Sequence, residues 1–318
     1  MIMNKFHPLT ITSINRLTAD AVAISFNVSN NTLFQFEAGQ YITIKKDING
    51  EEVRRAYSIC SMNSEGVTIG VKKVETGRMS SFLTQSVKEG DVLNVMPPSG
   101  NFVIKGDNKH IVGICAGSGV TPIIAMIKTE LAKPSDAKFT LIYGNKTKDS
   151  SMFAEELHQL QINNSDRLKI HNAYSREGVA GAINGRLDKN TIQQLLNTFM
   201  SLKTADAYFI CGPGELIDNT NELLLLNNIN QKKINFERFT TVEKTDLIDI
   251  DSDEIVSNVL VSVDGEDFEF TLSNKGQTIL DAAMEQGADV PFSCKGAVCC
   301  TCRAKVMEGS VTMDANYS

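Results

Sequence analysis

The chain has 318 residues, a length that suggests two or three domains rather than one. Apolar residues make up 42% of it and charged residues 22%, a globular composition that excludes disordered and fibrous classes. The net charge of −7 argues against a nucleic-acid binder, and the sequence has no run of about 18 apolar residues that could span a membrane. The first residues do not resemble a signal peptide, and seven cysteines without one indicate thiols kept reduced, so we expect a cytoplasmic protein.

Residues 1–105 alternate short apolar runs with turn signals, a pattern typical of a small antiparallel barrel. The predicted strands lie at 22–26, 41–44, 67–69 and 92–95. Cys60 lies in this region and Cys115 in the next, and isolated cysteines of this kind behave as small apolar residues.

A short motif in the barrel, Arg55-Ala56-Tyr57-Ser58, has side chains that suit a flavin. A tyrosine offers a flat face, an arginine a fixed fork for phosphate, and a serine hydroxyl can bond the ring edge where hydride arrives. Four residues alone could equally match by chance. Gly77-Arg78-Met79-Ser80 then opens a predicted helix over 80–85, whose free N–H groups suit a pyrophosphate. This second anion site favours FAD over FMN.

From residue 106 to 240, continuous apolar runs alternate with helical segments, which indicates a parallel α/β sheet. The predicted strands are 111–116, 139–143, 168–174 and 207–211. The predicted helices are 122–132, 152–160, 191–199 and 215–227.

Two glycine-containing loops follow predicted strands of this sheet, at the strand ends where open parallel sheets bind ligands. Gly117-Ser118-Gly119-Val120-Thr121-Pro122 lets the backbone approach a phosphate and puts proline at a first helical position. This loop lacks the usual third glycine, so alone it is weak evidence. The second loop, Cys211-Gly212-Pro213-Gly214, strengthens the prediction of a nucleotide site.

An acidic connector at 241–257 leads to a tail with strands predicted at 259–263, 268–272 and 303–306 and a helix at 278–286. Residues 241–256 carry a net charge of −5 and residues 258–318 another −5, whereas the first 240 residues carry +3. This split predicts that the tail docks transiently on the body, with the connector letting it swing; a merely solvated connector is the alternative.

Four cysteines gather in the tail, and Cys294, Cys299 and Cys302 have the plant-type spacing for a two-iron cluster. Zinc sites favour paired Cys-x2-Cys units, of which there is only one, but a zinc site or idle thiols remain alternatives. Cys300 is a poor ligand candidate, because its side chain should point away from those of its neighbours.

In this order the motifs resemble the ferredoxin–NADP reductase superfamily with a fused C-terminal plant-type ferredoxin, over nearly the whole chain. Within it, the stretch 293–306, Asn184-Gly185-Arg186 and Phe236-Glu237-Arg238-Phe239 are similar to reductase subunits of phenylacetyl-CoA epoxidases. The resemblance implies a Greek-key FAD barrel (1–105), an α/β NAD(P)-binding domain (106–240), a linker (241–257) and a β-grasp [2Fe-2S] domain (258–318).

The resemblance further implies an NAD(P)H-dependent oxidoreductase that passes electrons from NADPH, through FAD and a [2Fe-2S] cluster, to a partner oxygenase. The implied partner is a multi-subunit, di-iron enzyme, the phenylacetyl-CoA epoxidase of phenylacetate degradation. The alternatives are a reductase for a Rieske ring-hydroxylating dioxygenase or another iron protein, or a docking module whose flavin and nicotinamide sites are inactive. We expect neither nucleic acid nor membrane as a partner.

The resemblance also implies the roles of individual residues. Ser58 lies near the reactive flavin nitrogen, Cys211 beside the nicotinamide, and Thr121 where the two cofactors meet; these are the candidate catalytic residues. The other candidate cofactor-binding residues are Arg55, Ala56, Tyr57, Val71, Lys72, Gly77, Met79, Ser80, Gly117, Ser118, Gly119, Pro122, Gly144, Asn145, Ser175, Arg176, Gly212, Pro213, Glu237 and Phe239. Glu237 could instead be a surface carboxylate. The candidate iron ligands are Cys294, Cys299 and Cys302.

The coenzyme preference follows from Arg176, which comes after a predicted strand where the adenosine ribose should lie. An arginine there accommodates a 2′-phosphate, so NADPH is expected over NADH, with Lys146 assisting. The alternative is that Arg176 pairs with Glu177.

The position of Cys302 gives a last expectation, since the sequence continues for only 16 residues beyond it and the family's fourth ligand lies farther on. We therefore expect a fragment whose tail domain is incomplete, without an intact cluster. Flavin reduction should persist, while electron delivery to the oxygenase should fail.

Overall fold

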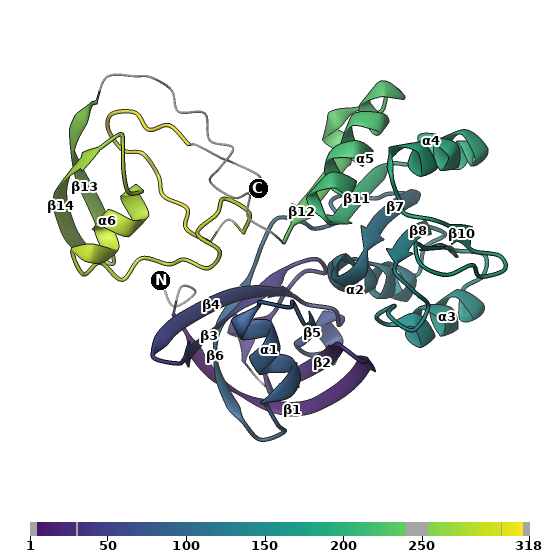
Figure 1. The fold of residues 1–318 in the computed structure, drawn as a ribbon, viewed down its shortest axis with the longest axis horizontal. Helices are drawn as coiled ribbons and strands as arrows, with labels where there is room; N and C mark the ends of the chain where they lie inside the picture. The colour runs from purple at the N-terminus through teal and green to yellow at the C-terminus, as the bar shows by residue number, and fades with distance from the viewer. Residues whose placement is uncertain (1–4, 30, 240–253, 300, 314–318) are drawn as a thin grey trace.

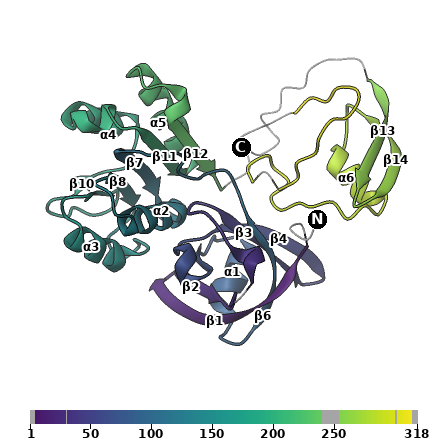
Figure 2. The same ribbon diagram turned by 180° about the vertical axis from the view of Figure 1, so that it is seen from behind.

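The computed structural model describes residues 5–29, 31–239, 254–299 and 301–313. Its chain forms an antiparallel barrel, a parallel sheet with helices on both faces, and a small C-terminal unit (Figures 1 and 2). Most of the predicted linker, and Cys300, lie outside the described residues.

The barrel is one six-stranded antiparallel sheet that curls on itself, in the order β4-β3-β6-β1-β2-β5. Apolar side chains from its strands fill the interior, where Ile24, Ile42 and Val95 are fully enclosed. The strands are β1 (His7–Thr18), β2 (Ala21–Phe26), β3 (Tyr41–Ile48), β4 (Glu51–Ser58), β5 (Thr68–Lys72) and β6 (Val92–Ser99). Helix α1 (Arg78–Gln85) packs against β4 and β5.

The second sheet is parallel, in the order β10-β9-β8-β7-β11-β12. Its strands are β7 (His110–Ala116), β8 (Lys138–Asn145), β9 (Leu168–Tyr174), β10 (Ile183–Asn184), β11 (Ala207–Gly212) and β12 (Ile234–Arg238). Side chains of α2 (Val120–Ala132) and α3 (Ala154–Asn163) fill one face, and those of α4 (Lys189–Thr198) and α5 (Gly214–Leu226) fill the other. Strand order reverses between β7 and β11, so the loops after these strands meet at a switch point, where such sheets bind ligands.

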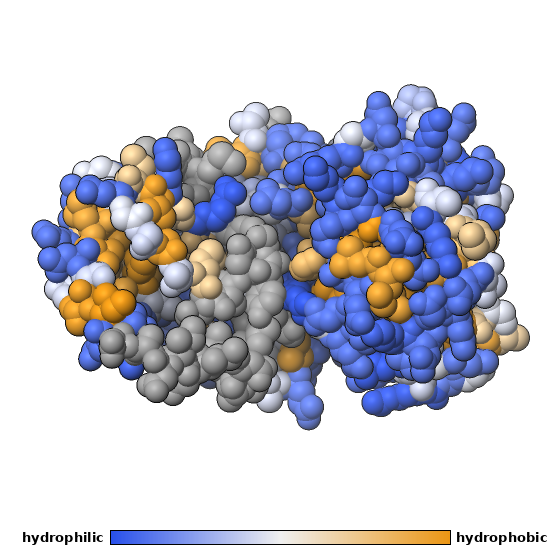
Figure 3. Space-filling view, turned by 90° about the horizontal axis from the view of Figure 1, so that it is seen from above, coloured by the Kyte–Doolittle hydropathy of each residue, from blue (hydrophilic) through white to orange (hydrophobic). Residues whose placement is uncertain are grey.

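The C-terminal unit has one hairpin, β13 (Val256–Val263) and β14 (Glu266–Ser273), and one helix, α6 (Ile279–Glu285). The strand predicted at 303–306 is wrong for this structure, because Val306 is 47% exposed and no strand follows β14 in the described part of the tail. Figure 3 shows apolar side chains gathered on the surface of this unit, where Leu260 and Met307 are exposed.

The barrel and the parallel sheet are joined by an ion-pair network centred on Lys128 of α2. Its ammonium group lies 2.7 Å from Glu65 in η3 (Asn63–Glu65) of the barrel and 3.1 Å from Glu156 of α3. Both carboxylates raise the pKa of Lys128 against the opposing effect of desolvation. In the described ranges, no helix is long and apolar enough to cross a membrane.

Candidate flavin, nicotinamide and cluster site

The loop after β7 packs directly against the end of β11. A Cβ atom on Gly119 would lie 2.1 Å from the Cys211 carbonyl oxygen, and Gly117 has a left-handed φ of +56°. Only glycine permits the close approach at Gly119, and glycine adopts the left-handed conformation at Gly117 without the cost that a side chain would add. Gly212, with a φ of +156°, and the exposed Pro213 then lead into α5. The predicted phosphate loops are therefore one continuous surface.

Ser58, Cys211 and Glu237 converge where β4 of the barrel meets β11 and β12. Glu237 is the register partner of Cys211, and its Oε2 accepts a hydrogen bond from the Ser58 hydroxyl at 3.4 Å. Desolvation raises the pKa of Glu237 to about 8, although the Ser58 bond opposes this shift, so its carboxyl group is largely neutral at pH 7. Glu237 is half-buried as a residue, and its carboxyl group faces Ser58.

Cys211 is fully buried and lies beside Cys115 on the neighbouring strand. Burial raises the pKa of its thiol well above the usual range, so the thiol stays neutral. Such a group can shape a cavity but does not act as an acid or a base at neutral pH.

Thr121 of α2 lies at a close contact between the barrel and the nucleotide domain. A Cβ atom on Gly70 of β5 would lie 2.5 Å from the Thr121 methyl group. The Thr121 hydroxyl donates to the Ser118 carbonyl at 2.9 Å, and Pro122 is buried in the first turn of α2. The same junction includes Val71, which is buried, and Lys72, which bonds the Ser150 carbonyl at 3.1 Å.

The other flavin-motif residues lie on or beside β4. Tyr57 is partly buried, and desolvation raises the pKa of its hydroxyl; Arg55 is exposed, bonds the Arg54 carbonyl, and opposes that shift.

Gly77 is the N-cap of α1, and a Cβ there would lie 2.4 Å from the Ser80 hydroxyl oxygen. Met79 points into the barrel core, so only its backbone can serve an anion at this helix start. Ala56 is half-buried, and Phe239, after β12, is exposed.

The adenosine side of the predicted nucleotide site is open. Ser175 and Arg176 are exposed after β9, and Gly144 and Asn145 end the adjacent β8. The Asn145 amide nitrogen is buried and makes no hydrogen bond of ordinary geometry, although the Tyr143 hydroxyl lies near it. Glu177 accepts a hydrogen bond from the backbone of Lys148, and no ion pair between Glu177 and Arg176 occurs in the described chain.

The cysteine loop brings two of its three predicted ligands together. Cys294 and Cys299 are close enough to hydrogen-bond, and this contact holds the pKa of the Cys299 thiol below its usual range. The Cys294 sulfur also accepts the N–H of Gly296 at 3.3 Å, a contact typical of iron–sulfur loops. Cys302 is exposed, and within the described residues no three metal-ligating side chains are gathered. Two of the three predicted ligands, Cys294 and Cys299, are thus placed together as a thiolate-bound cluster requires, and the third, Cys302, is exposed.

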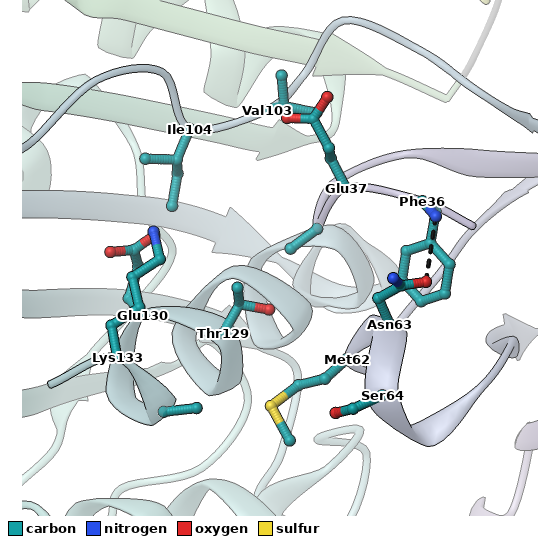
Figure 4. Close-up of a pocket in the computed structure, with 12 residues that line it drawn as sticks. Phe36, Glu37, Met62, Asn63, Ser64, Val103, Ile104, Thr129, Glu130 and Lys133 are labelled. Atoms are coloured by element: carbon teal, nitrogen blue, oxygen red, sulfur yellow. Dashed lines mark hydrogen bonds and ion pairs between the residues drawn. The ribbon is translucent and has the colours of Figure 1, made fainter.

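A separate cavity of about 340 Å³ lies between the barrel and the far end of α2 (Figure 4). Thr129 and Lys133 line it, whereas Thr121 is at the other end of the same helix. The buried Glu130 carboxylate in its wall already pairs with Lys133 at 2.5 Å. The cavity is therefore not part of the predicted cofactor site.

Family models match three parts of the chain. They are the oxidoreductase FAD-binding domain over residues 8–104, the oxidoreductase NAD-binding domain over 114–222, and the 2Fe-2S iron–sulfur cluster binding domain over 261–318. The chain is thus an NAD(P)H-dependent oxidoreductase with FAD, nicotinamide and ferredoxin-type domains.

Whole-chain relatives define the family more narrowly. The chain is 37% identical to a component of the 1,2-phenylacetyl-CoA epoxidase of Escherichia coli, over 99% of this chain and 91% of that one. It is 30% identical to the ferredoxin reductase component of 3-ketosteroid-9-alpha-monooxygenase from Rhodococcus rhodochrous, over 96% and 87%. Phthalate dioxygenase reductase shares the fold, with a TM-score of 0.65 and 24% identity over 93% of this chain and 85% of that one. The chain belongs to this family of ferredoxin-fused reductases.

The structure adds site neighbours that sequence reasoning missed. Gly70 was detectable, because a glycine inside a strand often marks a close backbone approach. Tyr41 and Arg54 contact the cysteine loop, and they carry no local motif.

Proposed function

We propose that this chain is the NADPH-dependent reductase of an oxygenase, and that its client is a multi-subunit di-iron phenylacetyl-CoA epoxidase acting in phenylacetate degradation. The observation that carries the proposal is the meeting of Ser58, Cys211 and Glu237 at the junction of the barrel and the nucleotide sheet, with the cysteine loop alongside. A site of this composition joins a hydride donor to a single-electron carrier. We also propose that the protein is cytoplasmic and that its domains are separated by boundaries after residues 105, 240 and 257.

The proposed work of the residues is to hold two rings at reaction distance. The Ser58 hydroxyl orients the flavin edge, and the neutral Cys211 thiol shapes the space for the nicotinamide. Thr121 fixes the width of the junction through its contact with Gly70. When bound, FAD accepts two electrons as hydride, and a [2Fe-2S] cluster that has Cys294, Cys299 and Cys302 among its four ligands carries single electrons.

The NADPH preference is supported by the surroundings of Arg176. Its side chain is exposed beside the adenosine end of the site, and the competing acid, Glu177, is engaged with a backbone N–H. A guanidinium in this position provides a planar fork for a 2′-phosphate, and the exposed Lys146 adds a second positive charge.

The epoxidase client is supported by the similarity to the Escherichia coli epoxidase component. A second candidate is another oxygenase, including a Rieske ring-hydroxylating dioxygenase. It is favoured by the similarity to a ketosteroid monooxygenase reductase component and by the fold shared with phthalate dioxygenase reductase.

An anaerobic titration of the full-length protein tests the reductase assignment. NADPH should bleach the flavin absorbance and then the absorbance of the cluster. Unchanged spectra would contradict the proposal. Mixing the reduced protein with purified epoxidase components and phenylacetyl-CoA should give turnover, and turnover only with a Rieske oxygenase would establish the second candidate instead.

A further inference from the structure

One face of β3 and β4 contacts both the flavin motif and the cysteine loop. Tyr41 is the register partner of Ser58, and Lys45 is the partner of Arg54 four residues along. Because strand side chains alternate, Tyr41, Arg54 and Ser58 all belong to the same face of the sheet. A segment that packs on this face of the sheet therefore lies next to Ser58.

The first contact on this face is made by the Tyr41 hydroxyl. It donates to the Cys299 carbonyl and lies 3.0 Å from the Thr301 hydroxyl. The Thr301 hydroxyl is in turn 3.2 Å from the Cys299 sulfur, so one side chain separates Tyr41 from a predicted iron ligand. Tyr41 is 4% exposed, and its ring packs closely against Gly100.

The second contact is made by the Arg54 guanidinium. It lies 3.9 Å from the centre of the Phe292 ring in the cysteine loop and 5.1 Å from the centre of the Phe6 ring. An ion pair with Glu52 at 2.7 Å fixes its orientation. A guanidinium held within cation–π distance of two rings recognises an aromatic side chain, and the ammonium group of a lysine lacks the planar surface that the guanidinium presents to both rings.

We propose that Tyr41 and Arg54 form a built-in seat that holds the cysteine loop of the ferredoxin-type domain against the flavin barrel. The contacts themselves do not depend on the proposed function. Only the purpose that we assign to the seat, which is to keep the two redox sites adjacent, rests on it. Among the described residues no ion pair crosses between the tail and the body, so the seat acts by hydrogen bonding and ring stacking.

Hydrogen–deuterium exchange on the full-length holoprotein tests the seat. In Tyr41→Phe the ring remains and the hydroxyl is lost, so exchange across residues 292–301 should rise on the order of fivefold, the factor one net hydrogen bond supplies. Arg54→Lys keeps the charge and should also raise it, and the double variant should exchange fastest. Tyr208→Phe is the matched control, because it loses a buried hydroxyl that bonds the Leu202 carbonyl far from the tail.

Unchanged exchange across 292–301 in both Tyr41→Phe and the double variant would overturn the seat. So would an equal rise in Tyr208→Phe, since that would report general loosening. Stopped-flow reduction of the flavin by NADPH is measured in parallel on the wild type. Failure of the wild type to reduce its flavin would contradict the proposed function while leaving the exchange comparison intact.

Discussion

Gly119 shows how much of the site depends on the size of one side chain. Its Cα lies so close to β11 that an added Cβ would overlap the Cys211 carbonyl group. The obstacle is backbone, which cannot rotate away as a flexible side chain could.

We expect Gly119→Ala to destabilise the protein by about 1–3 kcal/mol and to lower nucleotide affinity, because the loop after β7 must move away from the end of β11. Urea unfolding and NADPH titration measure the two effects. Gly178→Ala is the control, since its Cβ would meet only the Asn184 amide oxygen at 3.8 Å. Wild-type stability in Gly119→Ala would show that the loop does not pack as described.

Arg176→Ala should lower kcat/KM for NADPH on the order of tenfold, the size of a lost charge-assisted hydrogen bond, and leave NADH nearly unchanged. Steady-state kinetics with both coenzymes provide the internal control. An equal loss with NADH would mean that Arg176 serves the shared part of the coenzyme rather than the 2′-phosphate.

At the scale of elements, Asp206 ties the start of β11 to the start of β7. Its carboxylate accepts the N–H groups of His110 and Lys109 at 3.0 and 2.9 Å, and its own N–H bonds the His110 carbonyl. These two N–H groups hold the pKa of Asp206 below its ordinary 3.8. Because the folded pKa is the lower one, the bond stabilises fully above about pH 4 and is lost as the pH falls through the lowered value.

Asp206→Asn should therefore cost about 1 kcal/mol or less at pH 7, since solvent screens this carboxylate. The gap to wild type should close as the pH falls below 4. Urea unfolding in steps from pH 7 down to pH 2 measures it, with exposed Asp136→Asn as the control. A gap that does not narrow over this range would contradict the charge-based explanation.

The elements also show what sequence patterns can and cannot predict. The strand predicted at 168–174 is β9, and the helix predicted at 122–132 is α2 except for its first turn, because their apolar periodicity is unambiguous. Strand β12 was not predicted, since its five residues contain only two apolar side chains and are too few for their alternation to be recognised, yet it carries Glu237 to Cys211. The pairing of Tyr41 with the tail depends on residues 258 positions apart, which no local pattern reveals.

At the scale of the whole molecule, the charge split between body and tail predicts a salt effect. A tail of −5 should approach a body of +3 faster at low ionic strength, because the long-range attraction is unscreened. With the flavin reduced photochemically, so that NADPH binding plays no part, electron transfer to the cluster should slow severalfold between 20 mM and 500 mM salt, as about 22 Å of screening length falls to about 4 Å. A rate independent of salt would contradict the prediction.

Lys128 has a consequence for protein engineering. Its two carboxylate partners, Glu65 and Glu156, come from different domains, and only the intact pair of domains satisfies all three groups. A chimera that takes its barrel from a relative without an acid at position 65 would leave the ammonium with Glu156 alone, at a side chain that is 15% exposed. An exchange of the flavin module therefore preserves this contact with the nicotinamide module only when the new barrel also carries an acid at this position.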